Sequence, residues 1–155
     1  MFALMKTILI PIDSSAASDA VVATAGALAK SLPARVVLLT VVQPPVFTAE
    51  YTGVLENVAE IVAIGERAAA NHLARHQAKL EANGLAVESM QFTGAPVVHI
   101  IEQAEKARAD FIVMGSHGHT AVYDLLLGST THGVLKRAQC PVVIVPPAMT
   151  KTRSA

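Results

Sequence analysis

Short apolar segments alternate with helical patterns along nearly the whole chain, and this alternation limits the possible folds more than any other feature. Between the apolar segments, hydrophobic residues recur every three or four positions, which is the spacing of an amphipathic helix. Strands that alternate with helices predict a parallel sheet with helices on both faces. Five segments have strand character: residues 6–13, 34–42, 86–92, 110–115 and 140–146.

The segments between these strands carry helix start and stop signals. Ser14 or Ser15 can cap a helix after the first strand, because a short hydroxyl side chain bonds the free N–H groups at a helix start. A long helix is expected over about residues 54–82, with Asn83–Gly84 as its C-terminal stop. We interpret its apolar stripe as core packing or as a dimer face. A short helix is expected over residues 129–138.

Five strands connected in this way predict a single α/β domain, a five-stranded parallel sheet in the order 3-2-1-4-5. In that order the chain leaves the first strand toward one edge and returns beside it as the fourth strand. Ligands bind in the crevice where the direction reverses. Asp13 ends the first strand and Gly115 ends the fourth, so both should lie at this crevice. We expect residues 1–147 to form the domain and residues 148–155 to form a frayed tail.

The composition restricts the partners and the setting. The chain has 155 residues, of which 52% are hydrophobic and 15% charged, which is typical of a globular domain with a large core. Twelve basic and twelve acidic residues balance, so bulk charge predicts neither a nucleic-acid partner nor a membrane surface. The sequence shows no membrane-spanning run and no signal peptide. With Cys140 as the single cysteine, we expect a reducing, cytoplasmic setting.

Three glycines follow the fourth strand and predict a phosphate-binding loop. Gly115 and Gly118 allow a tight loop with exposed N–H groups, and Gly128 leads into a helix that starts with Ser129 and Thr130. A helix N-terminus has unpaired N–H groups and partial positive charge, and it therefore binds anions. The alternative is that the glycines serve only as turn residues.

Several other motifs and residues point to alternative binding sites or roles. The chain has neither the G-x-x-x-x-G-K-[ST] phosphate loop nor a G-x-G-x-x-G dinucleotide fingerprint. His117 lies within the glycine loop and either contacts phosphate or faces solvent. His72 and His76 have a chelating spacing on a helix, but no Cys, Asp or Glu joins them at an obvious zinc spacing. Asp13 either contacts the ligand or caps the first helix.

With these residues in view, the sequence resembles the universal stress protein family. The resemblance rests on the pattern G-x2-G-x9-G-[ST], met at Gly115, Gly118, Gly128 and Ser129. It rests further on "ILIPIDSS" in the first strand and loop, "VVLLTVV" in the second strand and "CPVVIVP" in the last. Together these segments extend over almost the whole chain.

The resemblance, to the ATP-binding branch of the family, implies a Rossmann-like (adenine nucleotide alpha hydrolase-like) domain, usually a homodimer. It implies ATP as the ligand, with Mg or Mn. Adenosine would be held at Pro11, Asp13 and Val41. Ribose and phosphates would be held at the glycine loop and the helix that follows it, by Met114, Gly115, His117, Gly118, Gly128, Ser129 and Thr130.

The expected function is a nucleotide-dependent stress-response regulator or interaction module. One alternative is a slow ATPase or phosphotransferase, which would need charged groups beside the phosphates. No lysine or arginine lies near the loop in sequence, and Lys136 and Arg137 come about two turns into the helix. A second alternative is a module of the same fold that binds AMP, a flavin or another nucleotide.

The last strand is predicted to join two copies of the chain. In the 3-2-1-4-5 order it lies at an open edge of the sheet, and an uncharged apolar edge strand aggregates unless it is paired. Two copies related by a two-fold axis would pair antiparallel and close the assembly. The alternative is a monomer whose residues 147–155 cover the edge. The pairing segment would be Val142, Val143, Ile144 and Val145.

Overall fold

The computed structural model describes residues 5–46, 57–116 and 127–147, and strands and helices alternate strictly along these ranges. The predicted tail lies outside the described residues. In chain order the elements are β1 Lys6–Ile12, α1 Ala17–Ser31, β2 Ala34–Val42, α2 Val58–Ala82, β3 Val87–Thr93, α3 Pro96–Lys106, β4 Phe111–Gly115, α4 Ser129–Arg137 and β5 Val142–Val145.

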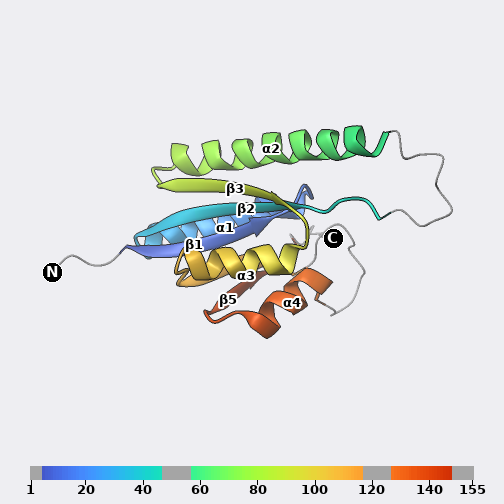
Figure 1. Ribbon diagram of the computed structural model, residues 1–155. Coiled ribbons are helices and arrows are strands. Elements are labelled where there is room, and N and C mark those ends of the chain that lie inside the picture. The colour runs from blue at the N-terminus through green and yellow to red at the C-terminus, as the bar shows by residue number, and fades with distance from the viewer. Residues whose placement is uncertain (1–4, 47–56, 117–126, 148–155) are drawn as a thin grey trace, which may run out of the picture.

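The strands form one parallel sheet in the order β3-β2-β1-β4-β5, as the sequence predicts (Figure 1). β1 lies in the centre, and the chain crosses from one half of the sheet to the other between β3 and β4. β3 and β5 are the two edge strands. This confirms both the fold class and the order of the strands.

Alternate residues of the central strands serve two separate cores. Ile8 and Ile10 pack on the side of α1 and α2, while Leu9 packs on the side of α3 and α4. All three side chains are 0% exposed. Because both faces of β1 are covered, the strand is a continuous apolar run rather than an alternating one, which is typical of parallel sheets.

The prediction that Ser14 or Ser15 caps α1 is wrong. The N-cap residue is Ala16, and no side chain makes a capping hydrogen bond there. The amide and hydroxyl of Ser15 donate instead to the carboxylate of Asp13. Ser15 therefore stabilises the loop that joins β1 to α1. Its hydroxyl bonds the carboxylate of Asp13 and not the free N–H groups at the start of the helix.

The two halves of α2 pack differently. Leu73 and Leu80 are buried in the core beside α1. Ile61 and Ile64, in the N-terminal half, are 46% and 53% exposed. Core packing thus explains the C-terminal half of the apolar stripe and not its beginning. The first predicted residues of this helix, 54–56, lie outside the described residues.

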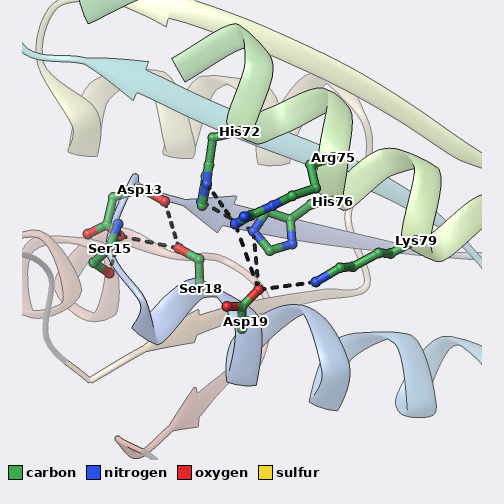
Figure 2. Close-up of polar contacts among 8 residues, drawn as sticks. All are labelled: Asp13, Ser15, Ser18, Asp19, His72, Arg75, His76 and Lys79. Atoms are coloured by element: carbon green, nitrogen blue, oxygen red, sulfur yellow. Dashed lines mark hydrogen bonds and ion pairs between the residues drawn. The ribbon is translucent and has the colours of Figure 1, made fainter. Parts of the chain in front are cut away.

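A polar cluster joins α1 to the C-terminal half of α2 (Figure 2). Asp19 of α1 lies within 4.0 Å of Arg75, 3.8 Å of His76 and 3.4 Å of Lys79, all on α2. Burial raises the pKa of Asp19, but the hydrogen bond and charge of Lys79, followed by the other cations, outweigh it and bring the pKa below 3.8. Asp19 therefore stays ionised at neutral and mildly acidic pH.

His76 is the buried member of this cluster, with 0% of its side chain exposed. Burial, followed by the neighbouring His72, lowers the pKa of His76 from the ordinary 6.5 to about 4. The folded protein therefore holds this ring neutral at a pH where the unfolded chain would protonate it. Folding stability must then fall as the pH falls through this interval.

None of the helices in the described ranges is long and apolar enough to cross a lipid bilayer.

We predict that stability is lost between pH 6.5 and about 4, by roughly 3 kcal/mol at most, because the unfolded state alone binds a proton at His76 in this interval. In the variant His76→Leu this pH dependence should largely disappear. Urea unfolding at several pH values measures it, with the exposed His132→Gln variant as the control. An unchanged slope in His76→Leu would contradict the assignment.

We also predict that Gly133→Ala destabilises the fold by about 1–3 kcal/mol. A Cβ at Gly133 of α4 would lie 2.8 Å from Cγ2 of Val97 on α3, so the Val97 side chain or one of these two packed helices must shift. The matched control is Gly65→Ala, whose Cβ would meet Val42 at an ordinary 3.8 Å and should gain up to about 1 kcal/mol of helix propensity. Urea unfolding compares the two, and stabilisation by both would refute the close contact.

Candidate functional site

A pocket of about 580 Å³ opens at the C-terminal ends of β1, β2 and β4. This is the crevice at which the strand order reverses, and it is large enough for a nucleotide-sized ligand. All of the predicted site residues that the structure describes line it. They are Pro11, Asp13, Val41, Met114, Gly115, Gly128, Ser129 and Thr130. The other two, His117 and Gly118, lie outside the described residues.

The pocket begins where β1 and β4 stop pairing. In this part of the sheet, Ile8 pairs with Phe111 and Leu9 pairs with Ile112. No later residues of β1 and β4 pair, although both strands continue. On its other side, β1 pairs with β2 as far as Ile12. β1 and β4 are therefore paired near their N-terminal ends and separate toward their C-terminal ends.

Pro11 accounts for the opening. The amide of Asp110 donates to the carbonyl oxygen of Thr7 and the amide of Thr7 donates to Asp110 Oδ2, both at 2.8 Å, so the backbone groups of Thr7 face β4. The backbone N–H and C=O groups of every second residue in a strand point toward the same neighbouring strand. Those of Leu9 and Pro11 therefore also point toward β4. Proline has no amide hydrogen and cannot continue the ladder there. A central strand tolerates it because pairing ends at this point.

Asp13 lines one side of the pocket, and Figure 2 shows it beside Ser15 and Ser18. Its Oδ1 accepts from the amide of Ser15 at 2.9 Å, from the Ser15 hydroxyl, and from Ser18 Oγ at 3.2 Å. Ser18 Oγ also approaches the backbone carbonyl of Asp13 at 2.7 Å. None of the described residues donates to Oδ2, so this oxygen has no partner within the described part of the protein.

The N-terminus of α4 forms the opposite wall. Gly128 is the N-cap residue; its amide donates to the carbonyl of Ser116 at 2.8 Å, and its carbonyl accepts from His132 at 2.9 Å. Thr131 Oγ1 donates to the carbonyl of Gly115 at 2.8 Å. These bonds fix the start of the helix against the end of β4.

The first amides of α4 are free to bind a ligand. Those of Ser129 and Thr130 have no acceptor among the described residues, as expected for the first turn of a helix. The first turn holds no acidic residue. Gly128 has φ −58° and ψ 157°, values open to any residue, so its conformation does not require glycine. Its lack of a side chain instead keeps the approach to these amides clear.

The remaining surface of the pocket is largely uncharged, and Asp13 is the one ionisable side chain among its described lining residues. Sequence reasoning did not assign Thr40, Gly65 or Ala69 to the site, although all three line it. Gly65 and Ala69 belong to the stripe on α2 that we interpreted as core. Their small size was the only available signal.

The pair His72 and His76 belongs to no metal-binding group among the described residues. Their Nε2 atoms lie 3.2 Å apart and contact each other. In the ranges that the structure describes, no three His, Cys, Asp or Glu residues are grouped so that they could hold a metal ion.

One known protein family matches nearly the whole chain. Residues 5–146 match the family described as the universal stress protein family. The chain belongs to the universal stress protein family. The chain is 34% identical to the universal stress protein MJ0531 of Methanocaldococcus jannaschii over 143 residues, which cover 92% of this chain and 82% of the relative.

Solved structures of the family share this architecture. The protein MJ0577, also of Methanocaldococcus jannaschii, superimposes with a TM-score of 0.79 at 30% identity and covers 96% of this chain and 100% of its own. A universal stress protein solved in complex with cAMP gives a TM-score of 0.64 at 28% identity and covers 93% of this chain and 98% of its own. The bound cAMP shows that a protein of this fold holds an adenine nucleotide.

Proposed function

We propose that this universal stress protein binds ATP in the pocket between β1 and β4 and acts as a nucleotide-dependent regulator or interaction module. The observation that carries the proposal is the pairing of two surfaces in one pocket. One is a cleft at the ends of β1 and β2 in which Asp13 is the one ionisable side chain among the described lining residues. The other is the start of α4, where the amides of Ser129 and Thr130 have no acceptor among the described residues. A nucleotide has an apolar base at one end and anionic phosphates at the other.

In this proposal, the adenosine lies against Pro11, Asp13 and Val41. This part of the cleft is mostly apolar, because apolar side chains from β2, α2 and α3 line it. The sugar and phosphates lie toward β4 and α4, where Met114 and Gly115 end the strand. The phosphates receive hydrogen bonds from the amides of the first turn of α4, aided by its partial positive charge.

A divalent cation, Mg or Mn, is proposed to accompany the nucleotide. The described lining includes the carboxylate of Asp13 and no lysine or arginine, so these residues supply no positive side chain to balance the phosphates. Mg²⁺ is usually bound through one or two carboxylates together with substrate phosphates. The unpartnered Oδ2 of Asp13 suits that role, either directly or through water.

The same electrostatics favour binding over catalysis. Efficient phosphoryl transfer needs cationic groups that stabilise the charge on the transferred phosphoryl group. Lys136 and Arg137, the basic residues of α4, lie in its last turn and are exposed. We therefore propose a regulator and not an efficient ATPase.

The neighbour solved with cAMP supports a second candidate ligand, an adenosine monophosphate. A monophosphate would reach the amides of α4 with a single phosphate and would need the cation less. Competition between ATP, AMP and cAMP for the same pocket distinguishes these candidates.

The regulator is proposed to work as a homodimer joined through β5. β5 pairs with β4 on one side, and no described strand covers its other side. Its four residues, VVIV, carry no charge that would protect the edge. The domain is proposed to span residues 1–147.

We predict that ATP with Mg binds the purified protein and that Gly128→Val reduces the affinity at least about tenfold, because a branched side chain would narrow the approach to the amides of α4. Calorimetry measures the binding, and thermal unfolding checks that the variant is folded. Lys136→Gln, in the last turn of the same helix, is the matched control and should bind normally. Normal ATP affinity in a folded Gly128→Val protein would place the phosphates elsewhere.

We predict slow or negligible ATP turnover by the isolated protein, well under ~1 per second, the low end of ordinary enzyme rates. The reason is the absence of lysine and arginine from the described lining of the pocket. Phosphate release from ATP with Mg or Mn measures it. Steady turnover at or above that rate would show that the missing charge is supplied in another way.

We predict that Val143→Lys converts a dimer into a monomer, because two lysines would lie near each other and near the two-fold axis. Light scattering at micromolar concentration measures the mass. Met90→Lys is the control: Met90 is likewise a partly buried apolar residue of an edge strand, β3, at the opposite side of the sheet. A wild-type monomer, or a Val143→Lys dimer of unchanged stability, would contradict the interface.

A further inference from the structure

A second hollow lies between α1 and α2, away from the nucleotide pocket. It has a volume of about 620 Å³ and shares no lining residue with the first pocket. Its α1 side runs from Asp19 to Lys30, about 16 Å at the rise of an α-helix. Its α2 side includes His76 and Lys79. We call this hollow the α1/α2 groove.

The contacts of the neighbouring cluster favour one tautomer of His76. Arg75 can only donate, so its contact of 3.2 Å with Nδ1 of His72 makes that nitrogen an acceptor. The proton of neutral His72 is then on Nε2, which lies 3.2 Å from Nε2 of His76. In this arrangement Nε2 of His76 accepts the bond that His72 donates.

The proton of neutral His76 is consequently on Nδ1, where it has no partner. Nδ1 is buried and makes no hydrogen bond with any described residue. A buried donor without an acceptor costs about 1–3 kcal/mol. The ring is completely buried yet lines the α1/α2 groove, beside the exposed side chains of Asp19 and Lys79. Movement of these two side chains would open the groove to Nδ1.

The cluster also lacks one negative charge. With His76 neutral, Arg75 and Lys79 carry two positive charges and Asp19 carries one negative charge. The same end of the groove thus has an unpartnered donor and one unbalanced cation. Both are satisfied by an anionic hydrogen-bond acceptor.

The rest of the groove suits an apolar chain. Ala23, Gly26 and Ala27 form the α1 side and Leu80 contributes from α2. A Cβ at Gly26 would lie 3.0 Å from Leu80, so the helices approach closely at this point. At the far end, Lys30 makes no ion pair or hydrogen bond with any described residue, and its aliphatic stem can cover a bound chain.

We propose that the α1/α2 groove binds an organic carboxylate with an unbranched apolar chain. The carboxylate accepts from Nδ1–H of His76 and pairs with Lys79, and the chain extends along Ala23, Gly26 and Ala27 toward Lys30. This site is independent of the nucleotide pocket. A protein that binds both ligands would combine a nucleotide signal with the level of an amphiphilic acid.

Octanoate is the probe, added to the ¹⁵N-labelled protein with and without ATP and Mg. Amide shifts should change at Ala23, Gly26 and Ala27, whether or not the nucleotide pocket is filled. Imidazole ¹⁵N spectra should show His76 protonated at Nδ1 before octanoate is added, and this proton should move downfield on binding. Because the readout is residue by residue, failure at this groove is distinct from failure of nucleotide binding.

The controls separate charge from apolar contact. Octanol, with the same chain and no charge, should bind at least about tenfold more weakly, and Lys79→Gln should weaken octanoate to a similar extent. Ala27→Leu, at an exposed position, should fill the groove and abolish binding. Lys136→Gln, on α4, should have no effect. The proposal is overturned by the absence of groove shifts at millimolar octanoate, by equal binding of octanol, by normal binding in Lys79→Gln, or by an Nε2–H tautomer at His76.

Discussion

The interruption of the ladder between β1 and β4 is the constraint on which the rest of this structure depends. Hydrogen bonds hold the two strands together as far as Leu9 and Ile112. Beyond that point Pro11 has no amide hydrogen to offer β4, and the chain has already reversed its direction across the sheet. The loops that follow the two strands therefore diverge around a pocket instead of closing over a continuous sheet.

Local hydrogen bonds then set the two walls of this pocket. Ser15 and Ser18 hold the carboxylate of Asp13, and Thr131 fixes the start of α4 on Gly115. The protein's own hydrogen bonds thus organise the rim, which reduces the entropy that a ligand must overcome on binding. What the described lining lacks is a cation. An ordered rim without a described cation suits the proposed ligand, a nucleotide that brings its own metal ion.

Much of this could be predicted from the sequence because it depends on local pattern. Apolar strands that alternate with helical spacing determine the order of the sheet, and the order places Asp13 opposite Gly115. The choice that a side chain makes between two possible hydrogen bonds could not be predicted in this way, and neither could contacts between distant residues. The serine after β1 bonds Asp13 instead of capping α1. His72 and His76 have a chelating spacing, yet they contact each other and Arg75, and His76 lies 3.8 Å from Asp19 on α1, a helix far away in the sequence.

The most direct test of the account is a crystal structure of the protein grown with ATP and Mg. The account predicts the adenine beside Val41, the phosphates on the amides of Ser129 and Thr130, and a metal ion between the phosphates and Asp13. It also predicts that the ladder between β1 and β4 still ends at Leu9. Nucleotide density at another surface, or phosphates turned away from the start of α4, would contradict it.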